Sequence, residues 1–205
     1  MKKYLIIMSI FVFISCSSKK FVTYSDYVFN PQNSFTRQLK AQYTDELNRI
    51  AQKFGEYNLR LQLNGVGFTK GSTCIDCIYQ DGNFWLFLSL EHENVDAGKN
   101  ISKKVRGLLV ANKLVKDAVF ALKSVKSEKL IADNNFMGFL VSGTYGIYEN
   151  INEMLKPKKF ETIDIYIPKD IFVDYINGKI SLNEVINFSK GYVADFESKD
   201  YQSIF

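Results

Sequence analysis

The sequence predicts an α+β domain, built from an antiparallel sheet of about four to five strands with helices packed mainly on one face. Long segments with apolar residues at helical spacing alternate with shorter segments of strand-like pattern, and consecutive strand-like segments lie close together along the chain. Apolar residues make up 46% of the 205 residues and aromatic residues 15%, which is enough for a packed core. We therefore expect residues 34–205 to form a single domain.

Two long helices are predicted. In residues 35–54, apolar side chains such as Leu39 and Leu47 recur at helical spacing, and Gly55 suits the C-terminal end. From about residue 100 to 125 the apolar face is broad, which is typical of a helix that covers a sheet. Two shorter helices follow near the C-terminus: one begins at Pro168 and stops at Asn177 and Gly178, and the other begins at the capping box Ser181 to Glu184 and ends near Gly191.

The first two predicted strands form a hairpin. Residues 58–64 alternate between apolar and polar, and the alternation shifts after Gly65, which indicates a bulge at Asn64 and Gly65. Asp81 and Gly82 lie between two apolar runs and predict a two-residue turn. The strand that follows, residues 84–90, is apolar on both faces, so we expect it to be central and covered on both sides.

The next two predicted strands are residues 136–148 and 160–167. Glycines in the first of them mark bends or close approaches: Gly138, Gly143 and Gly146. Written coarsely, the order is helix, strand, strand, helix, strand, strand, helix, helix. This order suggests an αββ-αββ arrangement, although the two halves show no similarity at the level of residues.

The first sixteen residues have the pattern of an export signal. Lys2 and Lys3 precede an apolar run over residues 4–14, which is too short to span a bilayer, and Ser15 precedes Cys16. This arrangement resembles a bacterial lipoprotein signal peptide, whose lipobox would be residues 13–16 with Phe in the place of the usual Leu. The resemblance implies cleavage before Cys16 and attachment of fatty acyl chains such as palmitate to Cys16. The alternative is an ordinary secretory signal in which Cys16 is incidental.

The lipoprotein resemblance implies a location in the cell envelope, with residues 1–15 removed as the signal peptide and residues 16–33 serving as a tether or N-terminal arm. Ser17 replaces the Asp that some bacterial lipoproteins use for retention in the inner membrane, which favours the outer membrane or its periplasmic face. The membrane, reached through the lipid, is the first expected partner, and a protein or other envelope component is the second. Loss of Lys2 and Lys3 from the 26 basic residues leaves 24 against 22 acidic residues, a balance that gives no reason to expect nucleic acid.

If Cys16 is acylated, Cys74 and Cys77 remain as a pair in a compartment where disulfides persist. We expect a structural disulfide that pinches a turn. A thiol-disulfide redox pair and two free thiols are the alternatives; the redox pair would place its first cysteine at a helix start, whereas this one precedes a strand. A zinc site that adds His92 is disfavoured, because the predicted hairpin separates Cys74 from His92 by about 10 Å.

The densest polar cluster comprises Glu91, His92, Glu93 and Asp96. Paired carboxylates of this kind could bind a hard cation or serve in acid–base catalysis. We favour a solvated strand end instead, because charged residues mostly lie on the surface. No metal and no cofactor are therefore expected.

A second charged feature is the basic loop of Lys156, Lys158 and Lys159. In a protein tethered close to a bilayer, such a loop could orient the domain on anionic headgroups. A solvated loop is the favoured interpretation.

The sequence has no zinc-protease helix, nucleophile elbow, phosphate-binding loop or dinucleotide fingerprint, and His92 is its one histidine. We therefore expect a lipid-anchored envelope protein that acts by binding or as a structural component rather than as an enzyme. One alternative is an envelope hydrolase that uses carboxylates such as Glu91 and Glu93. The other is a thiol-disulfide redox protein that uses Cys74 and Cys77.

Overall fold

The computed structural model describes residues 34–56, 61–70, 82–96, 101–125, 127–198 and 200–205. The α-helices are α2 (Ser34–Gln42), α3 (Thr44–Glu56), α4 (Lys103–Val125), α5 (Glu128–Ala132), α6 (Lys169–Ile176) and α7 (Leu182–Phe188), and η1 (Ile151–Glu153) is a 3-10 helix. The strands are β1 (Leu61–Lys70), β2 (Phe84–Glu91), β3 (Val95–Asp96), β4 (Phe136–Tyr148), β5 (Lys159–Pro168), β6 (Lys190–Asp195) and β7 (Tyr201–Ser203). The α+β class is confirmed.

The described strands form one sheet in the order β1-β2-β4-β5-β6-β7, with β3 paired to β4. The pairs β2/β4 and β3/β4 are parallel and the others antiparallel, so the sheet is mixed and the prediction of an antiparallel sheet is wrong on this point. The physical reason is that β2 and β4 are joined by a crossover through α4, which returns the chain across the sheet. The structure contains the suggested order of helix, two strands, helix, two strands, with β1 and β2 in the first half and β4 and β5 in the second. Because β2 and β4 are parallel, β4 runs opposite to β1, so shifting the first pair of strands along the sheet does not generate the second pair.

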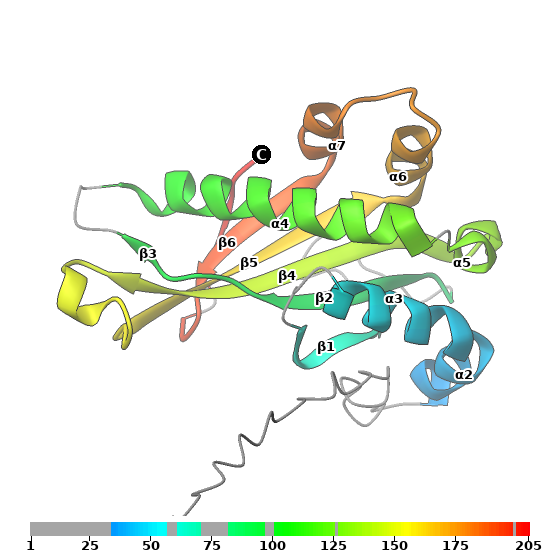
Figure 1. The fold of residues 1–205 in the computed structure, drawn as a ribbon, viewed down its shortest axis with the longest axis horizontal. Coiled ribbons are helices and arrows are strands. Elements are labelled where there is room, and N and C mark those ends of the chain that lie inside the picture. The colour runs from blue at the N-terminus through cyan, green and yellow to red at the C-terminus, as the bar shows by residue number, and fades with distance from the viewer. Residues whose placement is uncertain (1–33, 57–60, 71–81, 97–100, 126, 199) are drawn as a thin grey trace, which may run out of the picture.

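The helices cover one face of the sheet (Figure 1). The larger buried cluster lies between them and the sheet, and it extends from Leu39 in α2 to Ile204 after β7. Helix α4 passes close to β6, where a side chain at Gly107 would lie 3.0 Å from Cβ of Val193. Gly107 therefore lets this helix approach the sheet.

The first predicted helix is two helices that meet at Tyr43. The Thr44 hydroxyl donates to the carbonyl of Lys40 at 2.7 Å, a bond that competes with the helical ladder and bends a helix. Tyr43 is buried at the junction, and its hydroxyl donates to the carboxylate of Asp133. A tertiary contact thus fixes a bend that the local pattern does not reveal.

The bulge predicted at Asn64 and Gly65 falls in the interval where the β1/β2 register shifts, between Leu61 and Val66. In this interval β1 advances by five residues and β2 by two, so the irregularity is larger than the one extra residue of a simple bulge. The two-residue turn at Asp81 and Gly82 is wrong. Lys70 pairs with Phe84, so residues 71–83 connect the two strands. Gly82 has the positive φ that an Asp-Gly turn favours, 78°. This local preference does not fix the hairpin, because the residues that pair are set by the hydrogen bonds and packing along the whole of both strands.

The capping box predicted at Ser181 is confirmed: its hydroxyl accepts from the Glu184 amide at 3.3 Å, and the Glu184 carboxylate accepts from the Ser181 amide at 2.7 Å. The predicted helix after Pro168 is confirmed as α6, and the predicted helix over residues 100–125 as α4. Elements that the sequence pattern did not predict are α5, β3, β6 and β7. Strand β6 was missed because it is short and begins at Lys190, directly after Ser189, the C-cap of α7.

Candidate functional site

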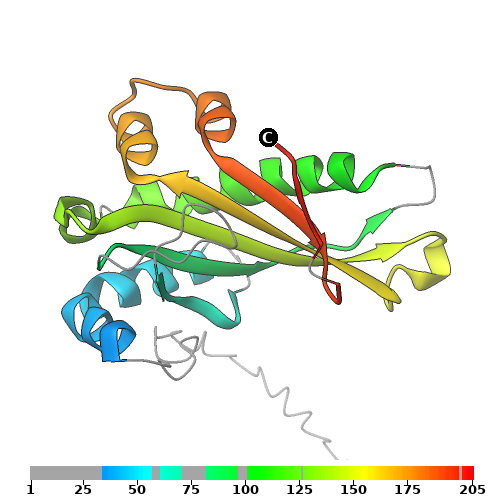
Figure 2. The same cartoon turned by 180° about the vertical axis from the view of Figure 1, so that it is seen from behind.

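The face of the sheet opposite the helices carries a second, smaller apolar cluster. Trp85 from β2, Leu140 from β4 and Tyr166 from β5 are its buried members, and Phe87, Met137 and Tyr192 pack against them. These side chains alternate with the core residues of the same strands, as the two-residue period of a strand requires. In Figure 2, the described helices lie behind the sheet or along its edges, so no described helix lies over this face. On this face of β2, Trp85 and Ser89 are buried and Phe87 is half-buried, and β2 lies between β1 and β4, so the prediction of a central strand buried on both sides is largely confirmed.

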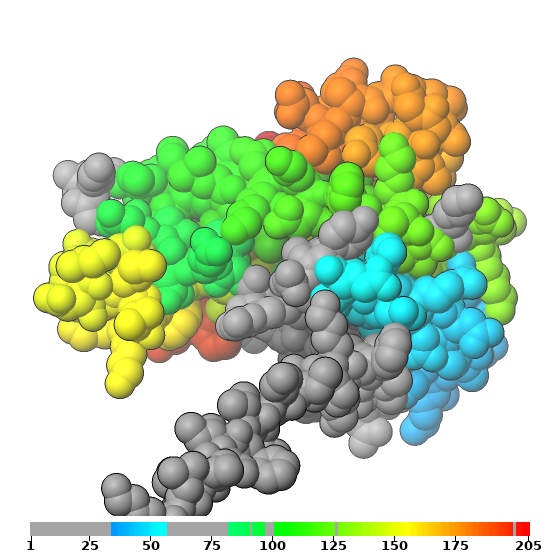
Figure 3. Space-filling model, viewed as in Figure 1, coloured from blue at the N-terminus to red at the C-terminus, as the bar shows by residue number. Residues whose placement is uncertain are grey.

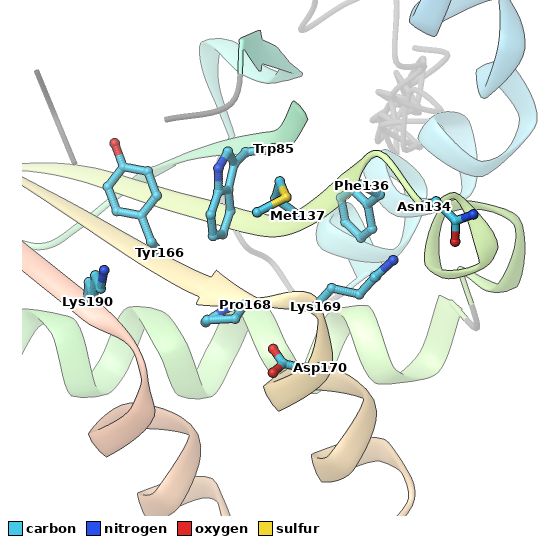
Figure 4. Close-up of a pocket in the computed structure, with 9 residues that line it drawn as sticks. All are labelled: Trp85, Asn134, Phe136, Met137, Tyr166, Pro168, Lys169, Asp170 and Lys190. Atoms are coloured by element: carbon cyan, nitrogen blue, oxygen red, sulfur yellow. The ribbon is translucent and has the colours of Figure 1, made fainter. Parts of the chain in front are cut away.

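A cavity of about 350 Å³ lies at one end of this face, where β2 and β4 begin and β5 ends. Figure 4 shows its lining, which comprises Trp85, Asn134, Phe136, Met137, Tyr166, Pro168, Lys169, Asp170 and Lys190. Its inner surface is mainly aromatic and aliphatic, and its charged groups come from the start of α6 and the start of β6. Its volume is in the range of small-molecule sites.

Trp85 and Tyr166 form an edge-to-face aromatic wall of the cavity, with their rings 5.2 Å apart at 87°. Behind the wall, Tyr166 contacts Tyr192, which does not line the cavity, at 6.3 Å and 84°. Such contacts hold aromatic side chains in one orientation. The wall is therefore preorganised to contact a flat or apolar group.

Gly138 makes room for the indole. It pairs with Trp85 across the β2/β4 ladder, and a side chain at Gly138 would lie 2.9 Å from Cζ3 of Trp85. Its φ of 142° is in a region that residues with a side chain rarely adopt. The sequence prediction that Gly138 marks a bend or a close approach is thus confirmed.

The rim of the cavity has a positive balance of charge, with two lysines and one carboxylate. Nζ of Lys169 donates to the backbone carbonyl of Asp133 at 2.9 Å, which holds it at the rim. Lys190 and Asp170 are exposed, and no ion pair joins Lys190 to any described residue. An anionic substituent of a bound ligand would find its complement here.

A carboxyl group lies further along the same face. Asp164 pairs with Ser142 across the β4/β5 ladder. Burial raises the pKa of Asp164 above its ordinary value, and a hydrogen bond from Ser142 partly offsets this effect. Because its folded-state pKa is raised, the ionised carboxylate destabilises the fold at every pH above the pKa of an unfolded Asp, and fully above the folded-state pKa.

We expect Asp164→Asn to raise the free energy of unfolding at pH 7 by about 1 kcal/mol, because the amide keeps an oxygen for Ser142 and removes the buried charge. Urea denaturation at pH 7 measures this effect. At about pH 3, where the carboxyl group is neutral in both states, the difference should vanish. Asp200→Asn, at an exposed position outside the helices, serves as the control and should change stability by less than about 0.5 kcal/mol. A lower stability of Asp164→Asn at pH 7 would contradict this prediction.

A buried ionic network lies on the helix-covered face. Glu161 is fully buried, and its carboxylate accepts from Arg106 at 2.5 and 3.1 Å and from the Tyr145 hydroxyl at 2.7 Å. The hydrogen bond to Glu161 raises the pKa of Arg106, and burial raises the pKa of Tyr145. All of these groups are used in bonds to one another, so we assign the network to structure and not to catalysis.

The polar cluster predicted from the sequence is not gathered into a described cavity. His92 lies beside Tyr145, with ring centroids 6.1 Å apart, and its Nδ1 is 2.7 Å from the carbonyl of Glu93. Its Nε2 is buried and has no partner among the described residues, and burial lowers the pKa of His92 below its ordinary value. Glu93 is exposed and 3.6 Å from Lys113, Asp96 is exposed on β3, and the side chain of Glu91 lies outside the described part of the chain.

Cys16, Cys74 and Cys77 also lie outside the described residues, as do the signal peptide and the tether. Within the described ranges, no group of three His, Cys, Asp or Glu side chains is placed to hold a metal ion. The cavity residues Trp85 and Tyr166 were not predicted as a site. The available signal was the one tryptophan of the chain, on a strand that is apolar on both faces.

Within the part of the chain that the structure describes, no helix is long and apolar enough to cross a bilayer. Comparison of the whole chain with protein-family models, with curated proteins and with solved structures finds no match. Inference about function therefore depends on the cavity and the surface of this chain itself.

Proposed function

We propose that this chain is a lipid-anchored binding protein of the cell envelope, which binds a small ligand in the cavity beside Trp85 and Tyr166. The observation that carries the proposal is this cavity of about 350 Å³, which has a fixed aromatic wall and a rim with a positive balance of charge. The anchor is Cys16, and its support is the lipoprotein-like pattern of residues 1–16. In this proposal, the anchor holds the protein at a membrane of the cell envelope, and the cavity binds the ligand.

The lining favours a ligand that combines an apolar or aromatic ring with an anionic substituent. The ring would lie against Trp85, Met137 and Tyr166, and the anion would lie near Lys190, which Figure 4 shows on the other side of the lining from the ammonium group of Lys169. The lining has one carboxylate, Asp170. A hydrolase of the glycosidase type uses two carboxylates on either side of the scissile bond, so this lining suits binding better than hydrolysis.

Trp85 is the one tryptophan of the chain, so its fluorescence reports directly on the cavity. We expect 4-nitrobenzoate to quench Trp85 saturably in the full chain, purified in detergent. The uncharged 4-nitrobenzamide, which has the same shape, should bind more weakly because it lacks the anion. Lys190→Glu should weaken 4-nitrobenzoate binding roughly tenfold and leave 4-nitrobenzamide unchanged.

Lys179→Glu provides the matched control, because it makes the same change of charge at an exposed position that does not line the cavity. It should leave both titrations as they are in the unsubstituted chain. Quenching without saturation, or equal weakening by Lys190→Glu and Lys179→Glu, would contradict the proposed site.

A further inference from the structure

We propose that the connection between β4 and β5 is a membrane-docking loop, which inserts an apolar tip among the lipids of an anionic bilayer. The apolar tip is formed by Ile151, Met154 and Leu155, whose exposed fractions are 72%, 42% and 88%. Figure 3 shows this segment, in yellow, protruding from one end of the molecule. Side chains of this size at these exposures contribute little to the stability of the domain.

The backbone of this connection is held in place although its apolar side chains are exposed. The side chain of Asn94 donates to the carbonyl of Met154 at 2.6 Å and accepts from the amide of Gly146 at 3.0 Å. Pro157 packs against Gly146, where a side chain would lie 2.7 Å from Cβ of Pro157. Asn150 caps η1 by accepting from a backbone amide of that helix at 3.1 Å. The fold thus presents the apolar tip on a fixed backbone.

Basic residues flank the apolar tip. Nζ of Lys158 lies 2.9 Å from Glu153 and that of Lys159 lies 4.0 Å from Glu149, but both lysine side chains are about four-fifths exposed, at 81% and 76%. Lys156 is exposed as well, so residues 149–159, which include Lys159 at the start of β5, carry three lysines and two glutamates and a net charge of +1. Apolar side chains that enter the acyl region, with lysines beside them at headgroup level, are the pattern of an interfacial anchor.

The short tether to the proposed lipid anchor favours a bilayer as the occupant. This step rests on the lipid anchor in the proposed function. Seventeen residues, 17–33, separate Cys16 from Ser34, so the anchor and the start of α2 are at most roughly 60 Å apart. The loop therefore meets lipid at a high effective concentration. Three protruding side chains are also few for a stable protein interface, which usually buries about 800 Å² on each partner.

The test introduces a tryptophan into the apolar tip of the full chain, reconstituted in vesicles of phosphatidylcholine and phosphatidylglycerol with brominated acyl chains. Leu155→Trp in a Trp85→Phe background reports on the tip, and Lys179→Trp in the same background is the control at an exposed position on the α6–α7 connection. We expect brominated lipid to quench the Leu155→Trp emission at least twofold and the Lys179→Trp emission by less than a tenth. Vesicles of brominated phosphatidylcholine without phosphatidylglycerol should quench the Leu155→Trp emission less, because they lack anionic headgroups for the lysines.

Equal quenching at both positions, or none at the tip, would overturn the proposal. Shielding of the Leu155→Trp indole from acrylamide without quenching by lipid would also overturn it and assign the tip to a protein partner or a second copy of the chain. If Trp85→Phe fails to fold, hydrogen exchange of the unsubstituted chain decides: amides in residues 150–156 should exchange at least threefold more slowly in vesicles with phosphatidylglycerol than in detergent, and unchanged exchange would overturn the proposal. The lipid anchor is tested separately by the intact mass of the protein, and a mass without an acyl group on Cys16 would refute it. In that case, quenching of the Leu155→Trp emission by added brominated vesicles would still support membrane docking by the apolar tip.

Discussion

Arg106→Met is expected to lower the free energy of unfolding by roughly 3–5 kcal/mol, because it leaves the carboxylate of Glu161 buried without its cation. Glu161 is fully buried, whereas Arg106 retains 13% side-chain exposure at the edge of the network. The carboxylate accepts three side-chain hydrogen bonds, and Arg106 donates two of them. The Tyr145 hydroxyl alone offsets little of the penalty for a buried charge.

Urea denaturation at pH 7 measures this loss. Lys103→Met is the matched control: it breaks the ion pair with Asp195 at 2.6 Å, whose side chains are 24% and 48% exposed, and should lower stability by no more than about 1 kcal/mol. The double variant Arg106→Met with Glu161→Leu should recover most of the loss, because neither charge of this network then remains. Equal losses in Arg106→Met and Lys103→Met would refute the structural role of the network.

Gly138→Ala is expected to lower the free energy of unfolding by about 3 kcal/mol or more, because the new methyl group meets backbone and not a movable side chain. It would overlap the carbonyl oxygen of Ile167 and lie 2.8 Å from the amide nitrogen of Lys169, at a φ of 142°. Since it would also lie 2.9 Å from the Trp85 ring, the emission maximum of Trp85 should shift in the folded variant.

Gly82→Ala separates strain from overlap. Its φ of 78° is also positive, but a side chain there has no neighbour within 4 Å among the described residues, so we expect the conformational strain of roughly 1–2 kcal/mol alone. Chemical denaturation of both variants, followed by circular dichroism, gives the two values. Equal destabilisation by Gly138→Ala and Gly82→Ala would contradict this prediction. It would mean that the overlap with Trp85, Ile167 and Lys169 adds nothing to the free energy cost of the strained φ.

The two variants also bear on the candidate site. Gly138 lies beneath Trp85, so a shifted indole should weaken 4-nitrobenzoate binding in Gly138→Ala under conditions where the variant remains folded. Arg106 and Glu161 lie on the opposite face of the sheet, and Arg106→Met should leave binding unchanged at urea concentrations well below its transition.

Most of the local structure could be read from neighbouring residues. The capping box at Ser181, the end of α6 at Asn177 and Gly178, and the bulge before Val66 all depend on contacts or backbone angles within a few residues. The glycines of β4 were also correctly singled out: the φ of Gly138 is a local feature, whereas Gly146 is needed for a close approach of Pro157, eleven residues further along the chain.

What local pattern could not reveal depends on partners distant in sequence. Whether β2 pairs with β4 in a parallel or an antiparallel sense depends on the path of α4, and the bend at Tyr43 depends on Asp133, ninety residues away. The same holds for the cavity, in which Trp85, Tyr166 and Lys190 come from three strands. The amino-acid pattern was sufficient for α4, α6 and α7 and for the longer strands β2, β4 and β5, because these follow from periodicity and end signals along the chain, but it missed α5, β3, β6 and β7. Only the tertiary structure could place an aromatic wall beside a lysine rim, because strand order brings together residues that share no local signal.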